Sequence, residues 1–343
     1  MTSRSQPDGR PASPPAMADV AAAAGVSHQT VSRVLNGHPS VRPATRDRVL
    51  AAVDRLGYRR NLAARALVTR RTNIIGTIVL SAQLSGQSGA LLGVEAAARA
   101  RGYWVSVAGV GSSPGLDLTD AISHFIDQGV DGLVVITPNQ DAIATAVQAA
   151  GRVPLVLVTS GAAPAGVPTA DVDQGMGIRQ LMNLLLGLGH RRIGLAAGPS
   201  DHLHATVREA AWREALAAAG VEPGPRVQAD WTAASGYAAA MEFLAGELPT
   251  AVVAANDLVA LGLLRGFRDA GVDVPGRVSV TGFDDIEGTD QSVPPLTTVR
   301  QDFDALGARC VELLLATIDG AEASAALIPT QLVVRSSTAA PPP

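Results

Sequence analysis

Residues 17–35 read MADVAAAAGVSHQTVSRVL, and this stretch decides the architecture at the start of the chain. The apolar side chains of its first half recur at helical spacing, at Val20, Ala23 and Ala24. Gly25 then ends the helix, because glycine readily adopts the left-handed backbone found at helix C-termini. Ser27 is suited to cap a following helix through its hydroxyl. The stretch therefore predicts two short helices separated by a tight turn.

The second helix has an apolar face made by Val31, Val34 and Leu35. Its polar side chains point elsewhere and belong to His28, Gln29, Ser32 and Arg33. A third helix follows, with Pro43 suited to its first turn and Gly57 at its end. The core face of that helix consists of Val49, Val53 and Leu56. Two helices joined by a Gly-containing turn make a helix-turn-helix unit, whose second helix lies in the major groove of DNA.

The second helix also carries side chains with the chemistry of base recognition. Gln29 can pair with an adenine edge, and the guanidinium of Arg33 can donate to both O6 and N7 of guanine. Short hydroxyl and amide side chains suited to phosphate contacts are Ser27, Thr30, Ser32, Asn36 and Thr45. The plain alternative is that all of these are ordinary solvated helix residues.

Charge divides the chain into a basic start and an acidic remainder. Residues 1–71 hold twelve Arg against four acidic residues, whereas residues 72–343 hold fifteen Arg against twenty-seven. Such asymmetry indicates a head that meets a polyanion and a body that does not. A solvated basic face would give the same count, so charge by itself does not decide the function.

A short basic segment links the two parts. Residues 58–72 read YRRNLAARALVTRRT, which favours a helical turn or two. An isolated helix of this length is marginal in water, so a partner is needed to order it. We predict that this segment is a hinge.

From residue 73 onward apolar strands alternate with helices. Strands are expected at 74–80, 104–108, 133–137, 155–158, 193–196, 251–255, 278–281 and near 332–334. Helices are expected at 91–101, 118–128, 177–188, 207–219, 234–244 and 258–270. Strands that are apolar on both faces and alternate with helices indicate parallel sheets covered on both sides. The length suits two such units, and ligands of open α/β sheets bind beyond the carboxyl ends of the strands.

The chain resembles the lactose-repressor family of bacterial transcription regulators over about residues 17–338. In the head the resemblance is carried by DVA at 19–21, AGVS at 24–27 and QTVSRVLN at 29–36. In the body it is carried by LGHRRI at 188–193, AGP at 197–199, DWTAASG at 230–236, PTA at 249–251, AND at 255–257, GFDD at 282–285 and TTVRQDF at 297–303. Around Trp231 the match is closest to the member that gives the family its name.

The resemblance implies an α + α/β fold class with a body like the periplasmic sugar-binding proteins. It implies a helix-turn-helix domain over 17–60, a hinge helix and linker over 61–72, and an effector-binding domain over 73–338. Subdomain one then takes about 73–171 and 303–330, and subdomain two takes about 172–300 and 331–338. Residues 1–16, rich in Pro, Ser and Arg, are expected to be a disordered leader, and 339–343 a tail.

The resemblance also assigns DNA contacts. His28 stands at a base-reading position where the member that gives the family its name has Tyr, so operator preference is expected to shift. The hinge helices of a dimer pair in the minor groove in this family, and Asn61, Ala64 and Leu67 match that segment. Leu67 matches the leucine that wedges between base steps, a known minor-groove device. Packing at the dimer contact is the alternative role for Leu67.

A sugar effector is implied by the residues that match the family's ligand contacts. Arg208 supplies a fork of donors, Asp284 two acceptor oxygens, and Asn256 both kinds of group. Trp231 offers a flat face to a sugar ring, and Phe303 is expected to wall the pocket. Leu84 and Thr159 complete the predicted effector site. The alternative roles are helix capping for Asp284, a solvated charge for Arg208 and a core position for Trp231.

Two departures concern the pocket wall. Thr159 replaces an Asp that holds sugar hydroxyls, and Ala170 replaces a Phe that lines the pocket in the member that gives the family its name. The pocket is therefore expected to be roomier and less polar on that side. A galactoside is the leading candidate for the inducer. A different sugar, or a corepressor such as a purine, remains the alternative.

Other function classes find little support. The sequence has no G-x-S-x-G, P-loop or H-E-x-x-H motif, and Gly109–Gly111 lacks the third glycine of a dinucleotide-binding fingerprint. We therefore expect no enzyme activity, catalytic residue, metal site or cofactor, since His202 and His204 alone are weak indicators of a metal. A transport-type binding protein would fit the body, but the basic head and the lack of a signal peptide argue against it.

Location and assembly follow from similar arguments. Cys310 is the sole cysteine, and no apolar run reaches the ~18 residues that a membrane span needs. We expect a nucleoid-associated cytoplasmic protein with no membrane partner, binding pseudo-palindromic double-stranded operator DNA as a homodimer. The chain ends soon after Arg335, without the heptad tail that forms tetramers in the family.

Overall fold

A computed structural model describes residues 15–59, 71–80, 85–111, 117–322 and 324–343. The chain divides into two compact units, residues 1–72 and 73–343, here called the head and the body. Each unit is described by itself. Within the described residues, every helix is too short or too polar to cross a membrane.

The head consists of three helices, as the sequence predicts. They are α1 (Met17–Ala24), α2 (His28–Leu35) and α3 (Pro43–Leu56). Gly25 ends α1 with φ of +64°, and the Ser27 hydroxyl caps α2 by accepting a hydrogen bond from the Thr30 amide at 3.2 Å. The core of the head is formed by Val20, Ala21, Ala24, Val31, Val34, Val49, Ala52 and Tyr58. One expectation was wrong: Ala23 is exposed and Ala21 is buried in its place.

Subdomain one of the body is built on a parallel six-stranded sheet. Its strands are β1 (Ile74–Leu80), β2 (Trp104–Val110), β3 (Gly132–Ile136), β4 (Leu155–Val158), β5 (Thr169–Val172) and β11 (Ala326–Ile328). The order is β11-β5-β4-β3-β1-β2, and every neighbouring pair is parallel. Strands such as Gly132–Ile136 are buried along their whole length, as expected for a sheet covered on both faces.

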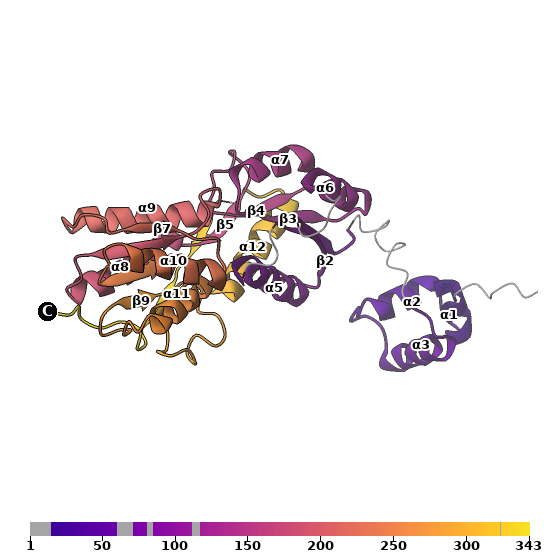
Figure 1. Cartoon of the computed structure of the whole chain (residues 1–343). Helices are drawn as coiled ribbons and strands as arrows, with labels where there is room; N and C mark the ends of the chain where they lie inside the picture. The colour runs from indigo at the N-terminus through magenta and orange to yellow at the C-terminus, as the bar shows by residue number, and fades with distance from the viewer. Residues whose placement is uncertain (1–14, 60–70, 81–84, 112–116, 323) are drawn as a thin grey trace, which may run out of the picture. The chain divides into compact units, whose positions relative to one another are not determined.

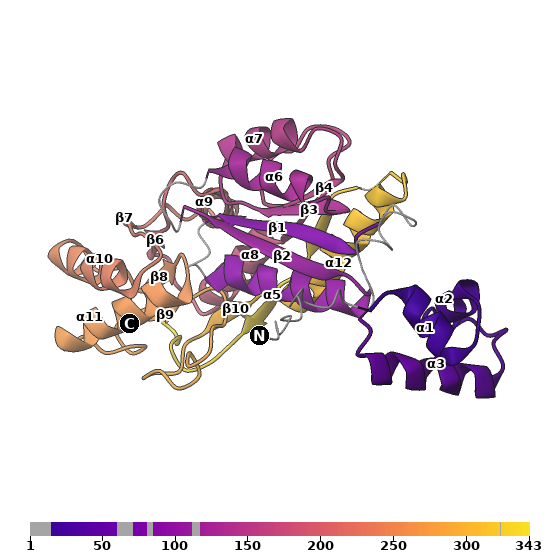
Figure 2. The ribbon, with the colours of Figure 1, turned by 90° about the vertical axis from the view of Figure 1, so that its right-hand side faces the viewer.

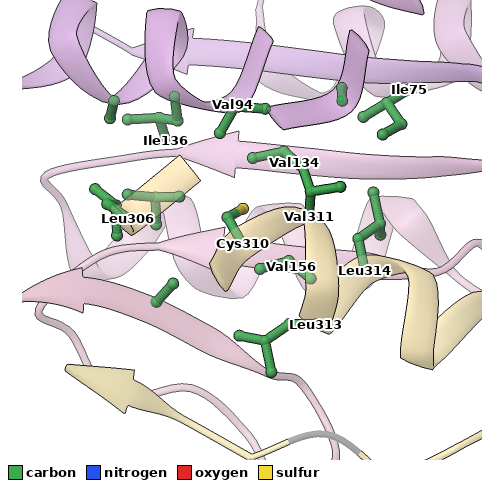
Figure 3. Close-up of a cluster of buried hydrophobic side chains, with 14 of the residues drawn as sticks. Ile75, Val94, Val134, Ile136, Val156, Leu306, Cys310, Val311, Leu313 and Leu314 are labelled. Carbon is green, nitrogen blue, oxygen red and sulfur yellow. The ribbon is translucent and has the colours of Figure 1, made fainter. Parts of the chain in front are cut away.

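Four helices cover this sheet, two on each face (Figures 1 and 2). They are α5 (Ser85–Ala100) and α12 (Phe303–Ile318) on one face, and α6 (Leu118–Asp127) and α7 (Gln140–Ala150) on the other. Figure 3 shows the core beneath α5 and α12, where Cys310 lies among Val134, Val156 and Val311. Burial raises the pKa of the Cys310 thiol to about 12, so this cysteine is a core residue that stays protonated.

Subdomain two repeats the plan with a four-stranded parallel sheet. Its strands are β6 (Ile193–Ala197), β7 (Arg226–Gln228), β8 (Ala251–Ala254) and β9 (Ser279–Thr281), in the order β7-β6-β8-β9. One face packs on α10 (Ala233–Ala245) and α11 (Asp257–Asp269), and the other on α8 (Gln174–Gly187) and α9 (Leu203–Ala218).

The chain crosses between the subdomains three times. It leaves β5 for α8, returns from β10 (Thr298–Arg300) to α12, and leaves β11 for β12 (Gln331–Val333). The strands β10 and β12 pair antiparallel as a small separate sheet. The crossings bring residues 171–174 and 300–303 next to each other at the boundary of the two subdomains, where Gln174 bonds to Gln301.

The predicted α + α/β class is confirmed, and the missed elements are four short strands and two helices. No element was expected at β5, β7, β10, β11, α7 or α12. The four strands hold only three or four residues each and rely on tertiary pairing. The helix α7 is Ala-rich with a weak apolar pattern, so its periodicity gave little signal. The end of the chain is also more ordered than a tail, because Ser337 and Ala339 bond to Val280 and Ser279.

Candidate functional sites: the exposed face of α2 and a cavity between the body's subdomains

The predicted DNA-reading side chains lie on the solvent face of the head. His28, Gln29, Arg33 and Asn36 are exposed. Ser32, Thr30 and Thr45 are half-buried. Ser27 is exposed, but its hydroxyl is engaged by the Thr30 amide and by the Thr30 hydroxyl at 2.9 Å. The face of α2 opposite the core therefore presents an amide and a guanidinium with no neighbour between them and solvent.

Four predicted positions lie outside the described residues. The hinge positions Asn61, Ala64 and Leu67 fall within 60–70, and Leu84 falls within 81–84. Their roles stay predictions from the sequence.

The body has a cavity at the boundary between its two subdomains. Its lining combines apolar and aromatic groups with a few polar ones, as is typical of sites for small molecules. Five predicted residues line it: Arg208, Trp231, Asn256, Asp284 and Phe303. Polar or charged residues that the sequence interpretation missed also line it, namely Gln87, Asp171, His204 and Gln301.

A closed ring of polar contacts forms one side of the cavity. Arg208 Nε donates to Gln174 Oε1 at 2.9 Å, and Gln174 Nε2 donates to Gln301 Oε1 at 3.1 Å. Gln301 Nε2 donates to Asp284 Oδ1 at 2.8 Å, and Arg208 Nη2 lies 3.5 Å from the same oxygen. Because Gln174 and Gln301 sit at crossings between subdomains, the ring ties the cavity to both connections. The rule that sites lie beyond strand ends would have pointed to both glutamines.

Arg208 is only 5% exposed, and its guanidinium contacts other groups of the protein on every side. Its Nη1 donates to the carbonyl of Ala255, and its plane lies 3.7 Å from the centre of the Phe283 ring. Burial lowers the pKa of Arg208, and the nearby charge of Asp284 counteracts that effect. A buried charge needs such compensation, so Arg208 and Asp284 are mutually dependent.

Trp231 and Asn256 form the adjoining wall. The indole Nε1 of Trp231 donates to His202 Nδ1 at 2.9 Å, and the Trp231 backbone has φ of +76°. A left-handed backbone is costly for a bulky side chain and commonly marks a functional site. Asn256 caps α11 by accepting from the Val259 amide at 2.9 Å, and its Nδ2 donates to the Trp231 carbonyl. Both residues therefore face the cavity while also having structural roles.

The opposite wall differs from the expectation for Thr159. Thr159 is 2% exposed, accepts a hydrogen bond from the Gly161 amide at 3.1 Å, and is absent from the cavity lining. Ala170 is fully buried in the core under α12. Asp171, the neighbour of Ala170, lines the cavity with a carboxylate, beside apolar groups such as Ile136 and Val158.

A second buried carboxylate lies beside Asp284. Asp257, at the start of α11, is fully buried and accepts hydrogen bonds from the Thr298 hydroxyl at 2.5 Å and the Ile286 amide at 2.9 Å. Burial first, and then the charge of Asp284, raise the pKa of Asp257 to about 7. This residue supports the loop that carries Asp284.

Comparison with known proteins matches two regions of the chain to family models. Residues 16–61 match the family described as bacterial regulatory proteins, lacI family, and residues 182–338 match the periplasmic binding protein-like domain. The lactose operon repressor of Escherichia coli is 36% identical over 332 residues, covering 96% of this chain and 92% of that protein. The transcriptional regulator CelR of Thermobifida fusca is 38% identical over 339 residues, covering 94% and 98%.

Solved structures agree with the sequence relatives. The Lac repressor dimer bound to operator and the anti-inducer ONPF has a TM-score of 0.86 at 34% identity, covering 96% of this chain and all of that one. The complex of the regulator CelR with cellobiose has a TM-score of 0.70 at 34% identity, covering 94% and 99%. The three-helix head, the two-lobed body and these full-length matches lead to one conclusion: the chain belongs to the lacI family of bacterial regulatory proteins and is a DNA-binding transcription repressor of that family.

Proposed function

We propose that this repressor binds a small sugar in the cavity between its subdomains, and that the sugar releases it from its operator. The observation that carries the proposal is the polar ring of Arg208, Gln174, Gln301 and Asp284 beside the indole of Trp231. A sugar has rigid hydroxyls that donate and accept, and a C–H face that packs on aromatic rings. The cavity offers donors, acceptors and aromatic rings side by side.

The identity of the sugar is narrowed by two relatives of similar closeness. One is a lactose operon repressor and the other a regulator whose structure contains cellobiose. Both disaccharides are β-linked, so we propose a β-glycoside, with a galactoside as the first candidate and cellobiose as the second. A purine repressor of Photobacterium profundum is more distant, at 30% identity.

The head is proposed to read DNA through the exposed face of α2. Gln29 and Arg33 contact bases, His28 modifies the preference, and the short hydroxyl side chains position the head on phosphates. We propose the domain functions predicted from the sequence, with DNA binding in 17–60, a hinge over 61–72 and effector binding in 73–338. A cytoplasmic location follows from the position of operator DNA in a bacterium.

A homodimer is supported by apolar side chains exposed on subdomain one. Leu92 on α5 is 68% exposed, and Trp104 and Val107 on the edge strand β2 are 69% and 50% exposed. Isolated exposed apolar residues are common, but three on neighbouring elements are typical of an interface. A dimer places two recognition helices on the half-sites of a pseudo-palindrome.

The test is release from DNA. The purified protein is bound to immobilised DNA from the intergenic region upstream of its own gene, and lactose, methyl β-galactoside, cellobiose, maltose and hypoxanthine are added separately. Release by lactose, methyl β-galactoside or cellobiose is expected, and release by maltose alone would contradict the β-glycoside. Tighter binding with hypoxanthine would instead assign a corepressor, and indifference to every glycoside would contradict the proposal.

The DNA-reading role has its own control. Arg33→Ala is expected to weaken binding to the upstream DNA about 5- to 150-fold more than binding to random-sequence DNA, because a bidentate guanine contact discriminates by about 1–3 kcal/mol. Arg48→Ala, an exposed arginine on α3, is the matched control, and its effect is expected to be the same on both DNAs. Equal losses for Arg33→Ala on both DNAs would remove Arg33 from base recognition.

A further inference from the structure

One pair of charged side chains in the cavity comes from both subdomains. Asp171 belongs to β5 of subdomain one, and His204 belongs to the first turn of α9 in subdomain two. His204 Nε2 lies 3.3 Å from Asp171 Oδ2, and both residues line the cavity. Next to this pair, the Leu203 amide donates to the Pro138 carbonyl across the same boundary at 2.8 Å. The two subdomains therefore meet at this edge of the cavity.

The hydrogen bonding of this pair is incomplete. Asp171 is 3% exposed, its Oδ1 accepts from the Val172 amide at 2.8 Å, and its Oδ2 accepts from the Ser160 hydroxyl. His204 Nε2 is buried yet is not aligned for a hydrogen bond to Asp171 or to any other described residue. A buried polar atom without a partner costs free energy, which a ligand that supplies one would regain.

The remainder of this wall explains why the pair matters. Subdomain one otherwise lines the cavity mainly with apolar groups, such as Ile136, Val158 and Val172. The polar ring around Arg208 is the neighbour of this pair, because His204 and Arg208 lie one turn apart on α9 and the charge of Asp171 acts on the pKa of Arg208. The hydroxyls of a bound sugar that face subdomain one meet polar groups chiefly at Asp171 and Gln87, and His204 of subdomain two lies beside Asp171.

We infer that Asp171 and His204 form a second polar subsite that binds one hydroxyl of the effector and selects the sugar by the position of that hydroxyl. This inference rests on the proposed sugar-binding function and deepens it. The hydroxyl donates its single proton to the Asp171 carboxylate and accepts a hydrogen bond from the Nε2–H of His204. Because each partner belongs to a different subdomain, the bound hydroxyl also holds the subdomains in one mutual arrangement.

The experiment is a calorimetric titration of the full-length protein with lactose and with cellobiose. Monodeoxy derivatives of whichever disaccharide binds are then titrated in turn. We expect one deoxy derivative to bind about 10- to 100-fold more weakly to the wild type through loss of the Asp171 contact, since hydrogen bonds to charged groups have that strength. Weaker binding of derivatives that lack other hydroxyls is expected to reflect lost contacts with the ring around Arg208.

Variants assign the sensitive hydroxyl to this pair. Asp171→Asn and His204→Ala are expected to bind the parent sugar about 10- to 100-fold more weakly. One deoxy derivative binds the wild type more weakly than the parent sugar does. In these variants its affinity is expected to lie within about threefold of that of the parent sugar, because the partner of the removed hydroxyl has itself been removed. Matched controls are Asp141→Asn and His124→Ala, which are exposed on helices outside the cavity and are expected to discriminate as the wild type does.

The outcomes separate this inference from the proposed function. If the wild type binds neither disaccharide, the proposed β-glycoside function fails first. Suppose instead that the wild type binds one disaccharide, and that Asp171→Asn and His204→Ala lose affinity for the same deoxy derivatives as the wild type does. The subsite is then overturned while the proposed function stands. Thermal unfolding checks each variant. If Asp171→Asn does not fold, His204→Ala decides between the two results, because His204 is partly exposed at the cavity.

Discussion

Single residues in the cavity show how a buried charge is stabilised at the boundary between the subdomains. Arg208 and Asp284 are each no more than 9% exposed, and each depends on the other and on the two glutamines of the ring. Phe283 packs against the guanidinium face, which excludes water from it. A guanidinium held in this way is already oriented for a ligand, so a sugar meets fixed donors instead of mobile ones.

The first prediction at this scale concerns the stability of the ion pair. Arg208→Met is expected to lower the free energy of unfolding by about 3–5 kcal/mol, because it leaves Asp284 buried without its counter-charge. The double variant Arg208→Met with Asp284→Asn is expected to recover a large part of that loss. Urea unfolding of the three proteins measures both effects. Additive losses in the double variant would show that the two charges do not interact.

The second prediction at this scale concerns pH. The folded pKa of Asp257 is raised to about 7 from 3.8, so the folded state favours the protonated carboxyl. The contribution of Asp257 to the free energy of unfolding is therefore greatest below pH 4. It falls as pH rises towards 7, by an amount on the order of 4 kcal/mol.

Asp257→Asn is expected to remove this slope. Relative to the wild type, the variant should be more stable at pH 8 than at pH 5, as measured by urea unfolding at each pH. The matched control is Asp290→Asn, an exposed aspartate, which should leave the difference between the two pH values unchanged. If the stability of the wild type falls no more between pH 5 and pH 8 than that of Asp257→Asn, the buried position of the carboxyl is contradicted.

Among the elements, the contact between α5 and α12 positions the cavity wall. A Cβ atom added at Gly93 would lie 2.0 Å from the Phe303 carbonyl oxygen, and one added at Gly307 would lie 2.0 Å from the backbone of Gly93. The two helices therefore touch backbone to backbone. This close approach brings Phe303 and Leu306 at the start of α12 to the cavity, next to Ala90 of α5.

The prediction at the scale of elements follows from that approach. Gly307→Ala is expected to destabilise the body by about 1–3 kcal/mol, because the added methyl group forces two backbones apart. It should also weaken sugar binding, since Phe303 moves with α12. Gly187→Ala, at the end of α8 with open space around it, is the control and should be neutral or slightly stabilising. Thermal unfolding and calorimetry report both effects, and an unaffected Gly307→Ala would contradict the helix contact.

For the whole molecule, the proposed DNA-binding and sugar-binding sites belong to separate units of opposite charge. The first 71 residues are basic and the remainder acidic, so electrostatic attraction to DNA is concentrated in the head. The body has three chain crossings between its subdomains, with Gln174 and Gln301 at two of them. A sugar that bonds to those crossings, or to Asp171 and His204, changes the balance between subdomain arrangements. Such a change is the kind of two-state element that coupling between distant sites requires.

The prediction at this scale is reciprocity. If a sugar weakens operator affinity by a given factor, saturating operator must weaken affinity for that sugar by the same factor, typically about 5- to 150-fold. Sugar titrations with and without a DNA duplex that contains the operator measure one side, and operator titrations with and without sugar measure the other. Identical sugar affinities in the presence and absence of operator would show that the two sites are uncoupled.

The sequence by itself determined the helix-turn-helix head, the alternation of strands and helices in the body, and five residues of the cavity. These features depend on residues that are close together in the sequence. Gly25, Ser27 and the apolar spacing of α2 act within a few residues of one another. The long buried strands and the helices α8 to α11 have apolar patterns that are clear enough to be recognised in the sequence. Resemblance to the lacI family then supplied Arg208, Asn256, Asp284, Trp231 and Phe303.

Only the tertiary structure decided which other residues join them. Asp171 and His204 are 33 positions apart, and Gln174 and Gln301 are 127 apart, and no local pattern links either pair. Thr159 and Asp171 show the reason most clearly: both lie near the ends of strands in subdomain one, but Asp171 lines the cavity whereas Thr159 bonds to Gly161. A side chain's direction at a strand end depends on register and on how the chain crosses to the next subdomain, and both are set by packing over long distances along the sequence.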